Sequence, residues 1–280
     1  MRTLEHLIRT RALSVLAIAA LALTACGSSA DDDAASATDT TSESPAGELT
    51  GTLTVFAAAS LTDVFTELGD QLMADNPDLD VRFNFAGSSA LATQLTQGAP
   101  ADVFASADEV QMAKVTDAEL AEDPEVFATN PQMLVVPADN PLGIHLPEGA
   151  GIPSLTEILD HDVTMAVCAP EVPCGAAAAK ILEAAGMSAY PDTYEDDVRA
   201  VLTKVELGEV DAGLVYVSDV HAAGDKVVAF AFSESSQAIN RYPISVLADS
   251  PNPAAAQAFV DLVLSDAGQQ ILRDAGFLEP

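Results

Sequence analysis

The chain has 280 residues, of which 43 are acidic and 11 are lysine or arginine, and its formal net charge at pH 7 is −32. A surface this acidic repels polyanions, which argues against nucleic acid as a partner and against direct contact with anionic lipid. The acidity keeps a protein in solution and says little about a small ligand. The length is sufficient for one large or two modest domains.

Residues 1–25 have the pattern of a secretory signal peptide. Arg2, Arg9 and Arg11 form a basic start, and an apolar run over residues 12–23 follows it. The run is too short to span a bilayer comfortably, as is typical of a signal peptide. We therefore expect an exported protein.

The signal ends in Leu23-Thr-Ala-Cys26, which resembles a bacterial lipobox. We expect a lipid on Cys26 that anchors the chain to the outer face of the cell membrane. An ordinary cleaved signal with a coincidental cysteine is the alternative. Residues 26–48 are mostly small and acidic and predict a flexible tether, which leaves residues 49–280 for the fold.

The folded part begins with a short apolar strand over residues 53–57, followed by small residues and then a helix that we expect Ser60 to cap at its N-terminus. Free N–H groups at such a turn, with the helix dipole behind them, can bind an anion. A plain strand-to-helix turn with a capping serine is the alternative. The apolar residues at helical spacing are Leu61, Val64, Phe65, Leu68 and Leu72.

A second unit of the same kind follows, with a strand over residues 79–85, Ser88 in the turn and a helix over residues 90–97. A third strand covers residues 101–106. Alternating strands and helices with short links predict an α/β fold with parallel sheets flanked by helices. Ligands of such sheets lie at the carboxyl ends of the strands, where both serine turns fall.

The remaining elements continue this pattern. Ser154 to Glu157 form a capping box before a short helix, and Tyr194 begins a helix with a buried stripe. We expect further strands over residues 130–137, 163–168, 226–232 and 242–247, a loop followed by a strand within residues 208–216, and further helices over residues 176–185, 253–264 and 267–277.

Besides Cys26, the chain has two cysteines, Cys168 and Cys174. In an exported protein such a pair favours a disulfide, which would stabilise the fold by roughly 2 kcal/mol in the chain-entropy model. A metal site is the weaker alternative, because the histidines of the folded part show no ligand spacing.

Six segments in order closely resemble the periplasmic molybdate-binding proteins of the ModA family. The resemblance covers residues 49–280. Each segment is a weak signal alone, and the ordered set is specific. The segments are Thr54–Asp63, Phe85–Ser89, Gly98–Asp108, Val172–Gly175, Glu195–Leu202 and Gly213–Asp219.

The resemblance implies a two-lobed substrate-binding protein of the type II periplasmic fold, with the ligand in the cleft between mainly parallel α/β lobes. The first lobe would comprise residues 49–129 plus 233–280, and the second residues 130–232. It also implies a monomer that has no cofactor and no enzymatic activity. Such a protein delivers molybdate or tungstate to the permease and ATPase subunits of an ABC importer.

By the same resemblance, five residues would bind the oxyanion. Ser60 and Ser88 would donate hydroxyl and backbone N–H groups, Cys174 and Val198 backbone N–H groups, and Tyr216 its phenol. No protein atom would contact the metal directly. If the disulfide forms, it would brace the turn that presents the N–H group of Cys174.

These five groups suit a fully ionised anion, which offers only acceptors. A protonated phosphate would need an acceptor, and none is among them. We expect Arg199 and Lys204 to be solvated surface residues. We expect Asp196 and Asp197 to face outward and to cap their helix.

Three alternatives remain. The same fold could bind another ligand, such as sulfate, phosphate, an amino acid or a carboxylate. The chain could be an exported hydrolase using Ser60 or Ser88, although neither serine lies in a Gly-x-Ser-x-Gly or Ser-x-x-Lys motif. It could also be an adhesion lipoprotein without a ligand.

Overall fold

The computed structural model describes residues 48–149, 151–159 and 163–280. The expected signal peptide, Cys26 and nearly all of the expected tether lie outside these residues. The strands are β1 (Gly51–Ala58), β2 (Leu79–Ala86), β3 (Val103–Ala105), β4 (Glu125–Asn130), β5 (Gln132–Pro137), β6 (Met165–Cys168), β7 (Thr193–Glu195), β8 (Ala212–Tyr216), β9 (Val227–Phe230) and β10 (Asn240–Val246). The α-helices are α1 (Thr62–Asp75), α2 (Ser88–Thr96), α3 (Glu109–Asp117), α4 (Leu155–Ile158), α5 (Pro173–Ala184), α6 (Val198–Glu206), α7 (Val217–Ala223), α8 (Pro253–Leu264) and α9 (Asp266–Asp274), and the short 3-10 helices are η1 (Ala59–Leu61), η2 (Gly224–Lys226) and η3 (Ser233–Gln237).

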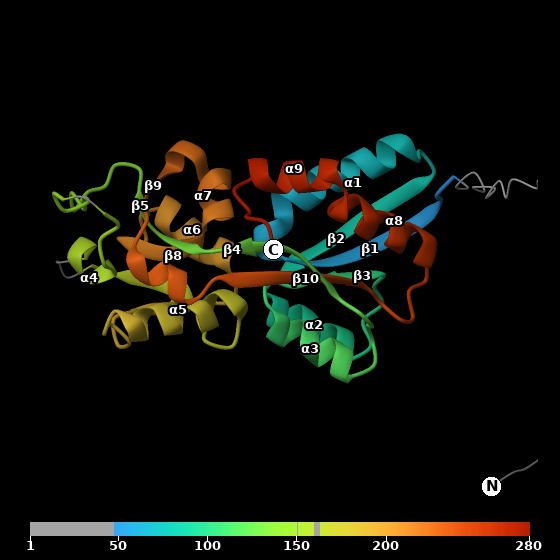
Figure 1. Ribbon diagram of the computed structural model, residues 1–280, viewed down its shortest axis with the longest axis horizontal. Coiled ribbons are helices and arrows are strands. Elements are labelled where there is room, and N and C mark those ends of the chain that lie inside the picture. Colours follow the sequence, from blue (N-terminus) through green and yellow to red (C-terminus); the bar gives the residue numbers. More distant parts are fainter. Residues whose placement is uncertain (1–47, 150, 160–162) are drawn as a thin grey trace, which may run out of the picture. The chain divides into compact units, whose positions relative to one another are not determined.

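The strands form two five-stranded sheets, in the orders β2-β1-β3-β10-β4 and β7-β6-β8-β5-β9. Their elements gather in two groups, which we call the first and the second lobe (Figure 1). Strands joined through helices pair in parallel, β1 with β2 and β3, and β6 with β7 and β8. Strands β10 and β5 pair antiparallel with both of their neighbours. The chain therefore has the α/β fold expected from its alternating pattern.

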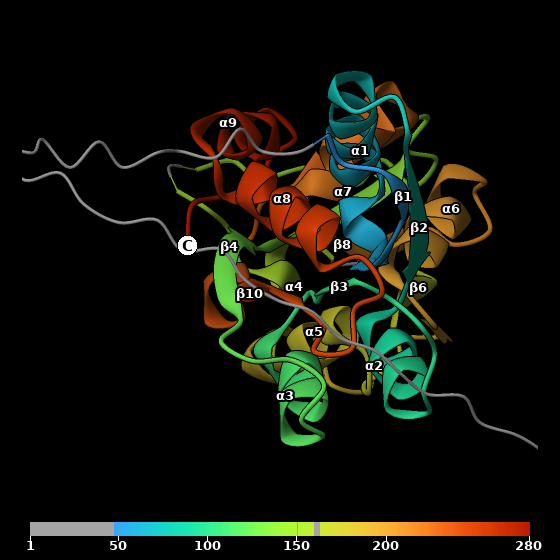
Figure 2. The same ribbon diagram turned by 90° about the vertical axis from the view of Figure 1, so that its right-hand side faces the viewer.

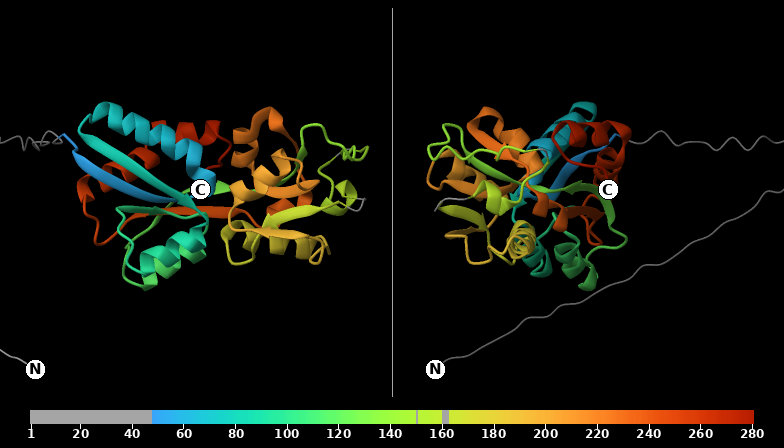
Figure 3. Two further views of the ribbon diagram at one scale, coloured as in Figure 1. Left: turned by 180° about the vertical axis from the view of Figure 1, so that it is seen from behind. Right: turned by 60° about the vertical axis from the view of Figure 1, so that its left-hand side comes forward.

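Helices cover both faces of the first sheet, with α1, α8 and α9 on one side and α2 and α3 on the other (Figures 2 and 3). The larger core lies under α1, where the fully buried Phe65 packs edge-on against Phe259 with ring centroids 5.2 Å apart. The apolar residues expected on one face of α1 are all buried. This packed core therefore fixes the positions of the parallel strands of the first lobe.

The second sheet is also covered on both faces. Helices α4 and α5 pack on one face through residues such as Leu155 and Ile181. Helix α6 packs on the other, where Val198, Val201 and Val205 are buried against the sheet. Both sheets therefore have their helices, and the turns that begin them, around the carboxyl ends of parallel strands.

The chain crosses between the lobes twice. The first crossing is at Pro131, between β4 and β5. The second lies between Gln237 and Asn240, somewhat beyond the expected boundary at residue 233. Helix η3 stays with the second lobe, because the Ser235 hydroxyl donates to the Gln132 carbonyl at 2.6 Å.

Three local predictions were wrong or incomplete. The sequence analysis missed β4 and helix α7. It also began a helix at Tyr194, which lies in β7, and α6 begins only at Val198. A short edge strand before the helix explains the error, because its residues alternate in burial rather than follow a helical period. Among the helices of the described residues, none is both long and apolar enough to cross a membrane.

Candidate functional site

A small cavity lies between the two lobes, and all five residues expected to bind the ligand line it. The volume open to the centres of water-sized atoms is about 10 Å³, which is on the order of what one buried water needs. The lobes therefore stand close together around it. The lining residues are Ala58, Ala59, Ser60, Ala86, Gly87, Ser88, Ala107, Pro173, Cys174, Asp197, Val198 and Tyr216.

Several helices begin at this cavity, from both lobes. Helices η1 and α2 start at Ala59 and Ser88 on the first lobe, and α5 and α6 start at Pro173 and Val198 on the second. The first N–H groups of a helix have no acceptor within the helix, and the dipole makes its start electropositive. Their convergence makes the cavity a place for negative charge without a cationic side chain.

Ser60 lies at this junction, but it does not cap α1 as expected. The N-cap position is Leu61, and no side chain there makes a capping bond. Instead the Ser60 hydroxyl shares a hydrogen bond of 2.9 Å with the hydroxyl of Tyr242 on β10. Both residues are buried. Because each hydroxyl has one proton and only one proton lies between them, the pair keeps one O–H to donate.

Ser88 and Tyr216 provide further hydroxyl donors. The Ser88 hydroxyl oxygen accepts from the Ala107 N–H at 3.0 Å, which leaves its own proton free to donate. The Tyr216 hydroxyl is buried next to Tyr242, with ring centroids 6.0 Å apart, and makes no hydrogen bond of ordinary geometry among the described residues. An unsatisfied buried hydroxyl costs about 1–3 kcal/mol, so a bound acceptor would stabilise this arrangement.

The electrostatics keep Tyr216 protonated. Burial raises its pKa well above 10, and the neighbouring Tyr242 and Asp219 act in the same direction. Asp219 accepts the backbone N–H of Tyr216 at 3.1 Å. Burial also raises the pKa of the Asp219 carboxyl to about 6, against the opposing attraction of Arg199. Tyr216 therefore acts only as a donor at neutral pH.

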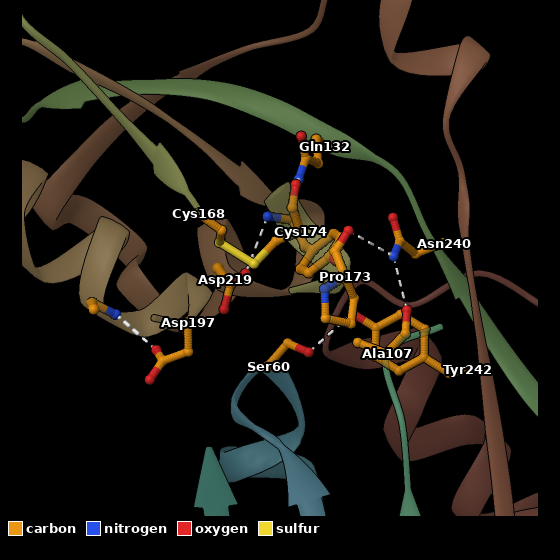
Figure 4. The surroundings of a disulfide bond; sticks show 12 residues. Ser60, Ala107, Gln132, Cys168, Pro173, Cys174, Asp197, Asp219, Asn240 and Tyr242 are labelled. Atoms are coloured by element: carbon orange, nitrogen blue, oxygen red, sulfur yellow. Dashed lines mark hydrogen bonds between the residues drawn. A yellow bond between two sulfur atoms is a disulfide. The ribbon is translucent and has the colours of Figure 1, made fainter. Parts of the chain in front are cut away.

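Cys174 is bonded to Cys168 in a disulfide, with Cα atoms 5.6 Å apart (Figure 4). The Cys174 carbonyl also accepts from the Gln132 side-chain amide at 2.8 Å. The turn tolerates only glycine at Gly175, where a Cβ atom would lie 1.8 Å from the Ala169 carbonyl oxygen. The disulfide and this packing fix the start of α5, and with it the Cys174 N–H.

Among the described residues that line the cavity, only Asp197 is charged, so the expectation that it faces outward was wrong. It does cap α6 as expected, because its Oδ1 accepts the Ala200 N–H at 2.9 Å, while Asp196 is exposed and is not the N-cap residue. Lys204 forms an ion pair with Glu195 rather than pointing into solvent. Among the residues that the structure describes, no cluster of histidine, cysteine and carboxylate side chains could hold a metal ion.

The sequence analysis was wrong about Arg199. It is not a solvated surface residue, because its Nε lies 2.8 Å from the buried Asp219 and its Nη2 lies 2.7 Å from Asp63 on α1. Burial opposes its charge, but the two carboxylates raise its pKa. Its positive charge is therefore matched inside the protein.

Two residues around the site were missed by sequence reasoning. Tyr242 sits in the apolar run of β10 and appears there as an ordinary core residue. Asn240 lies at the second crossing, where its amide donates to the Ala107 carbonyl at 2.8 Å and to the Pro173 carbonyl at 3.4 Å, thus linking both walls of the cavity (Figure 4). Asn240 is the first residue of β10 and precedes the strand expected over residues 242–247, so no local signal identified it.

Two α/β lobes joined by two crossings, with a donor-lined cavity between them, define a two-lobed solute-binding protein. The comparisons with known proteins agree. Residues 53–278 match the family model described as "Bacterial extracellular solute-binding protein". The molybdate-binding protein ModA of Mycobacterium tuberculosis (strain H37Rv) is 44% identical over 269 residues, covering 95% of this chain and 96% of that protein. The chain thus belongs to the ModA family of bacterial extracellular solute-binding proteins.

Solved structures show the same fold. The periplasmic molybdate-binding protein of Azotobacter vinelandii matches with a TM-score of 0.69 at 18% identity, covering 81% of this chain and 99% of that one. The sulfate-binding protein SubI of M. tuberculosis matches with a TM-score of 0.62 at 17% identity, covering 81% and 86%. At these identities the likeness concerns the fold alone and does not distinguish the ligands.

Proposed function

We propose that the protein captures molybdate, and tungstate equally well, in the cavity between its lobes. The observation that carries this proposal is a cavity between the lobes where the hydroxyl groups of Ser60, Ser88 and Tyr216 meet helix N-termini from both lobes. The relative that is 44% identical over nearly the whole chain is named for molybdate binding, which favours this oxyanion. Ser60, Ser88 and Tyr216 would donate hydroxyl groups, and Cys174 and Val198 backbone N–H groups.

A site rich in donors favours a fully ionised tetrahedral oxyanion. Molybdate, tungstate and sulfate carry no proton at neutral pH, whereas every phosphate ion keeps at least one proton there and needs an acceptor for it. The one wall carboxylate among the described residues, Asp197, accepts the Ala200 N–H at the start of α6 through Oδ1, which leaves Oδ2 as the acceptor that a protonated phosphate could use. Sulfate remains the fully ionised alternative, and it differs from molybdate in size rather than in hydrogen-bonding chemistry.

The magnitudes are consistent with tight binding. A hydrogen bond to a charged partner contributes about 1.5–3 kcal/mol. Five or six such bonds would give on the order of 8–18 kcal/mol before the costs of association and closure. A sub-micromolar dissociation constant needs a net free energy of about 8 kcal/mol or more, which the upper part of this range would leave after those costs.

The same proposal covers the protein's place in the cell. It is a monomeric, non-enzymatic carrier that delivers its anion to the permease and ATPase of an ABC importer. Its family is that of extracellular solute-binding proteins, and the lipobox at Cys26 supports a lipid anchor on the outer face of the membrane. Mass spectrometry of the membrane fraction would detect the acylated Cys26, and its absence from wild-type cells would refute the anchor.

Thermal unfolding tests the ligand. The purified protein, dialysed free of anions, is titrated separately with molybdate, tungstate, sulfate and phosphate. A ligand at a hundred times its dissociation constant should add about 2.7 kcal/mol to the free energy of unfolding. A shift with molybdate and tungstate alone supports the proposal. A shift with sulfate instead would overturn the specificity, and no shift with any oxyanion would overturn the function.

A further inference from the structure

Arg199 forms an ion pair between the two lobes, outside the cavity. It is the second residue of α6 on the second lobe, and its Nη2 donates to Asp63 Oδ2 at 2.7 Å. Asp63 lies in the first turn of α1 on the first lobe. With Ser60, both residues line a separate crevice between the lobes. The ion pair therefore exists only while the lobes are close together.

The Arg199 guanidinium also contacts a carboxylate of its own lobe, that of Asp219. Its Nε lies 2.8 Å from Asp219 Oδ1, and the Asp219 side chain is completely buried. An exposed ion pair loses much of its value because two long side chains must be ordered. Here Asp219 has already ordered the arginine, so little further entropy is lost when Arg199 meets Asp63.

Each member of this chain of charges is attached to a residue of the cavity. Arg199 follows Val198, and Asp63 comes three residues after Ser60, which is one helical turn. Asp219 accepts the backbone N–H of Tyr216. The ion pair thus ties together segments that carry donors from both lobes, so breaking it loosens the cavity that they form.

We propose that Arg199 is a positioning residue for the anion site: anchored by Asp219, it reaches across to Asp63 and holds the lobes closed on the ligand. This rests on the proposed function. Arg199 is not a counter-ion for the anion, because it is absent from the cavity wall and two carboxylates already match its charge. Its effect falls on ligand release, since the pair forms after the lobes have closed.

Asp63→Asn tests the proposal, because Asp63 is 61% exposed and its replacement leaves the Arg199–Asp219 pair intact. The matched control is Asp80→Asn, which removes an exposed pair of the same length, 2.7 Å, to Arg82 within the first lobe. In stopped-flow measurements with molybdate we expect Asp63→Asn to speed dissociation about 3- to 10-fold while association changes less than twofold. Asp80→Asn and Asp63→Glu should resemble the wild type.

Charge alone predicts the opposite result. Removing a carboxylate near a dianion would strengthen binding, so faster dissociation identifies the interlobe contact. Wild-type kinetics in Asp63→Asn, with molybdate still bound tightly, would overturn the proposal and leave the proposed function intact. If the wild type does not bind molybdate, the distance between spin labels at Asp70→Cys on the first lobe and Lys180→Cys on the second tests the Arg199–Asp63 contact instead. Asp63→Asn must lengthen this distance, and an unchanged distance refutes the proposal that the ion pair holds the lobes closed.

Discussion

Gly87 offers a test of whether the closed arrangement is the one that binds. It is the N-cap residue of α2 on the first lobe, with φ −58° and ψ 133°, a conformation open to any residue. An added Cβ atom would lie 2.4 Å from the carbonyl oxygen of Asp196 on the second lobe and 3.3 Å from Val172 Cγ1. Gly87→Ala should therefore fold normally and be unable to close fully.

The expected size follows from the geometry. Cβ atoms essentially never approach closer than 3.0 Å, so at this contact the lobes must stay at least 0.6 Å further apart. Hydrogen bonds of ordinary length stretch past their useful range with such a shift. The loss of two charge-assisted bonds from the second lobe would cost about 3–6 kcal/mol, so molybdate should bind roughly 10²- to 10⁴-fold more weakly.

Calorimetry with molybdate on the wild type and Gly87→Ala measures this loss. Ser89→Ala is the matched control, because it adds no atom next to the same turn and Ser89 is not on the cavity wall. The anion-free thermal midpoint of Gly87→Ala should equal that of the wild type, which separates closure from folding. If Gly87→Ala binds molybdate with wild-type affinity, the closed cavity is not the binding state and the reasoning from donor convergence fails.

Three further outcomes are expected. Tyr216→Phe should weaken molybdate binding about 10- to 100-fold in calorimetry, because it removes one charge-assisted donor, and unchanged affinity would exclude this phenol as a ligand. Replacing Cys168 and Cys174 together by alanine should lower the free energy of unfolding by about 2 kcal/mol in denaturant titrations and weaken binding, whereas unchanged affinity would exclude a bracing role. Burial raises the Asp219 pKa from 3.8 to about 6. Between these two pH values the carboxyl is therefore ionised in the unfolded state but still protonated in the folded state. Lowering the pH from 7 to 4 should therefore stabilise the wild type relative to Asp219→Asn by up to roughly 3 kcal/mol, and parallel stability curves would contradict the shift.

The fold could be predicted from local patterns because its units are local. Each strand, small-residue turn and helix of the first lobe reveals itself within about twenty residues, and the apolar period of α1 identified its buried face. Strand β4 (Glu125–Asn130) gave no comparable signal, because it pairs with β10, far along the chain, and its Phe127 packs in the first-lobe core against Phe65. Its existence depends on a partner that local reasoning cannot see.

The site likewise contains residues that a local sequence pattern identifies and residues that depend on a distant partner. Ser60 and Ser88 could be found because they stand in turns between strands and helices, where anion sites form. Tyr242 and Asp63 could not, because their partners lie 182 residues from Tyr242 and 136 residues from Asp63. Arg199 was misjudged for this reason, since a lone cation at the start of a helix resembles a solvated residue until Asp219 and Asp63 are placed beside it.

In the proposed site, the division of the donors between the lobes would allow a tightly bound ligand to be released. Ser60 and Ser88 lie on the first lobe, and Cys174, Val198 and Tyr216 on the second, so neither lobe alone offers more than part of the set. Separating the lobes removes several charge-assisted bonds at once, each about 1.5–3 kcal/mol, and readmits water to an ion that prefers it. A partner that holds the lobes apart therefore lowers the affinity by orders of magnitude without touching the ligand. Neutral donors suit this task in a chain of net charge −32, because none of the described residues that line the cavity is a cation that would retain the anion once the lobes have opened.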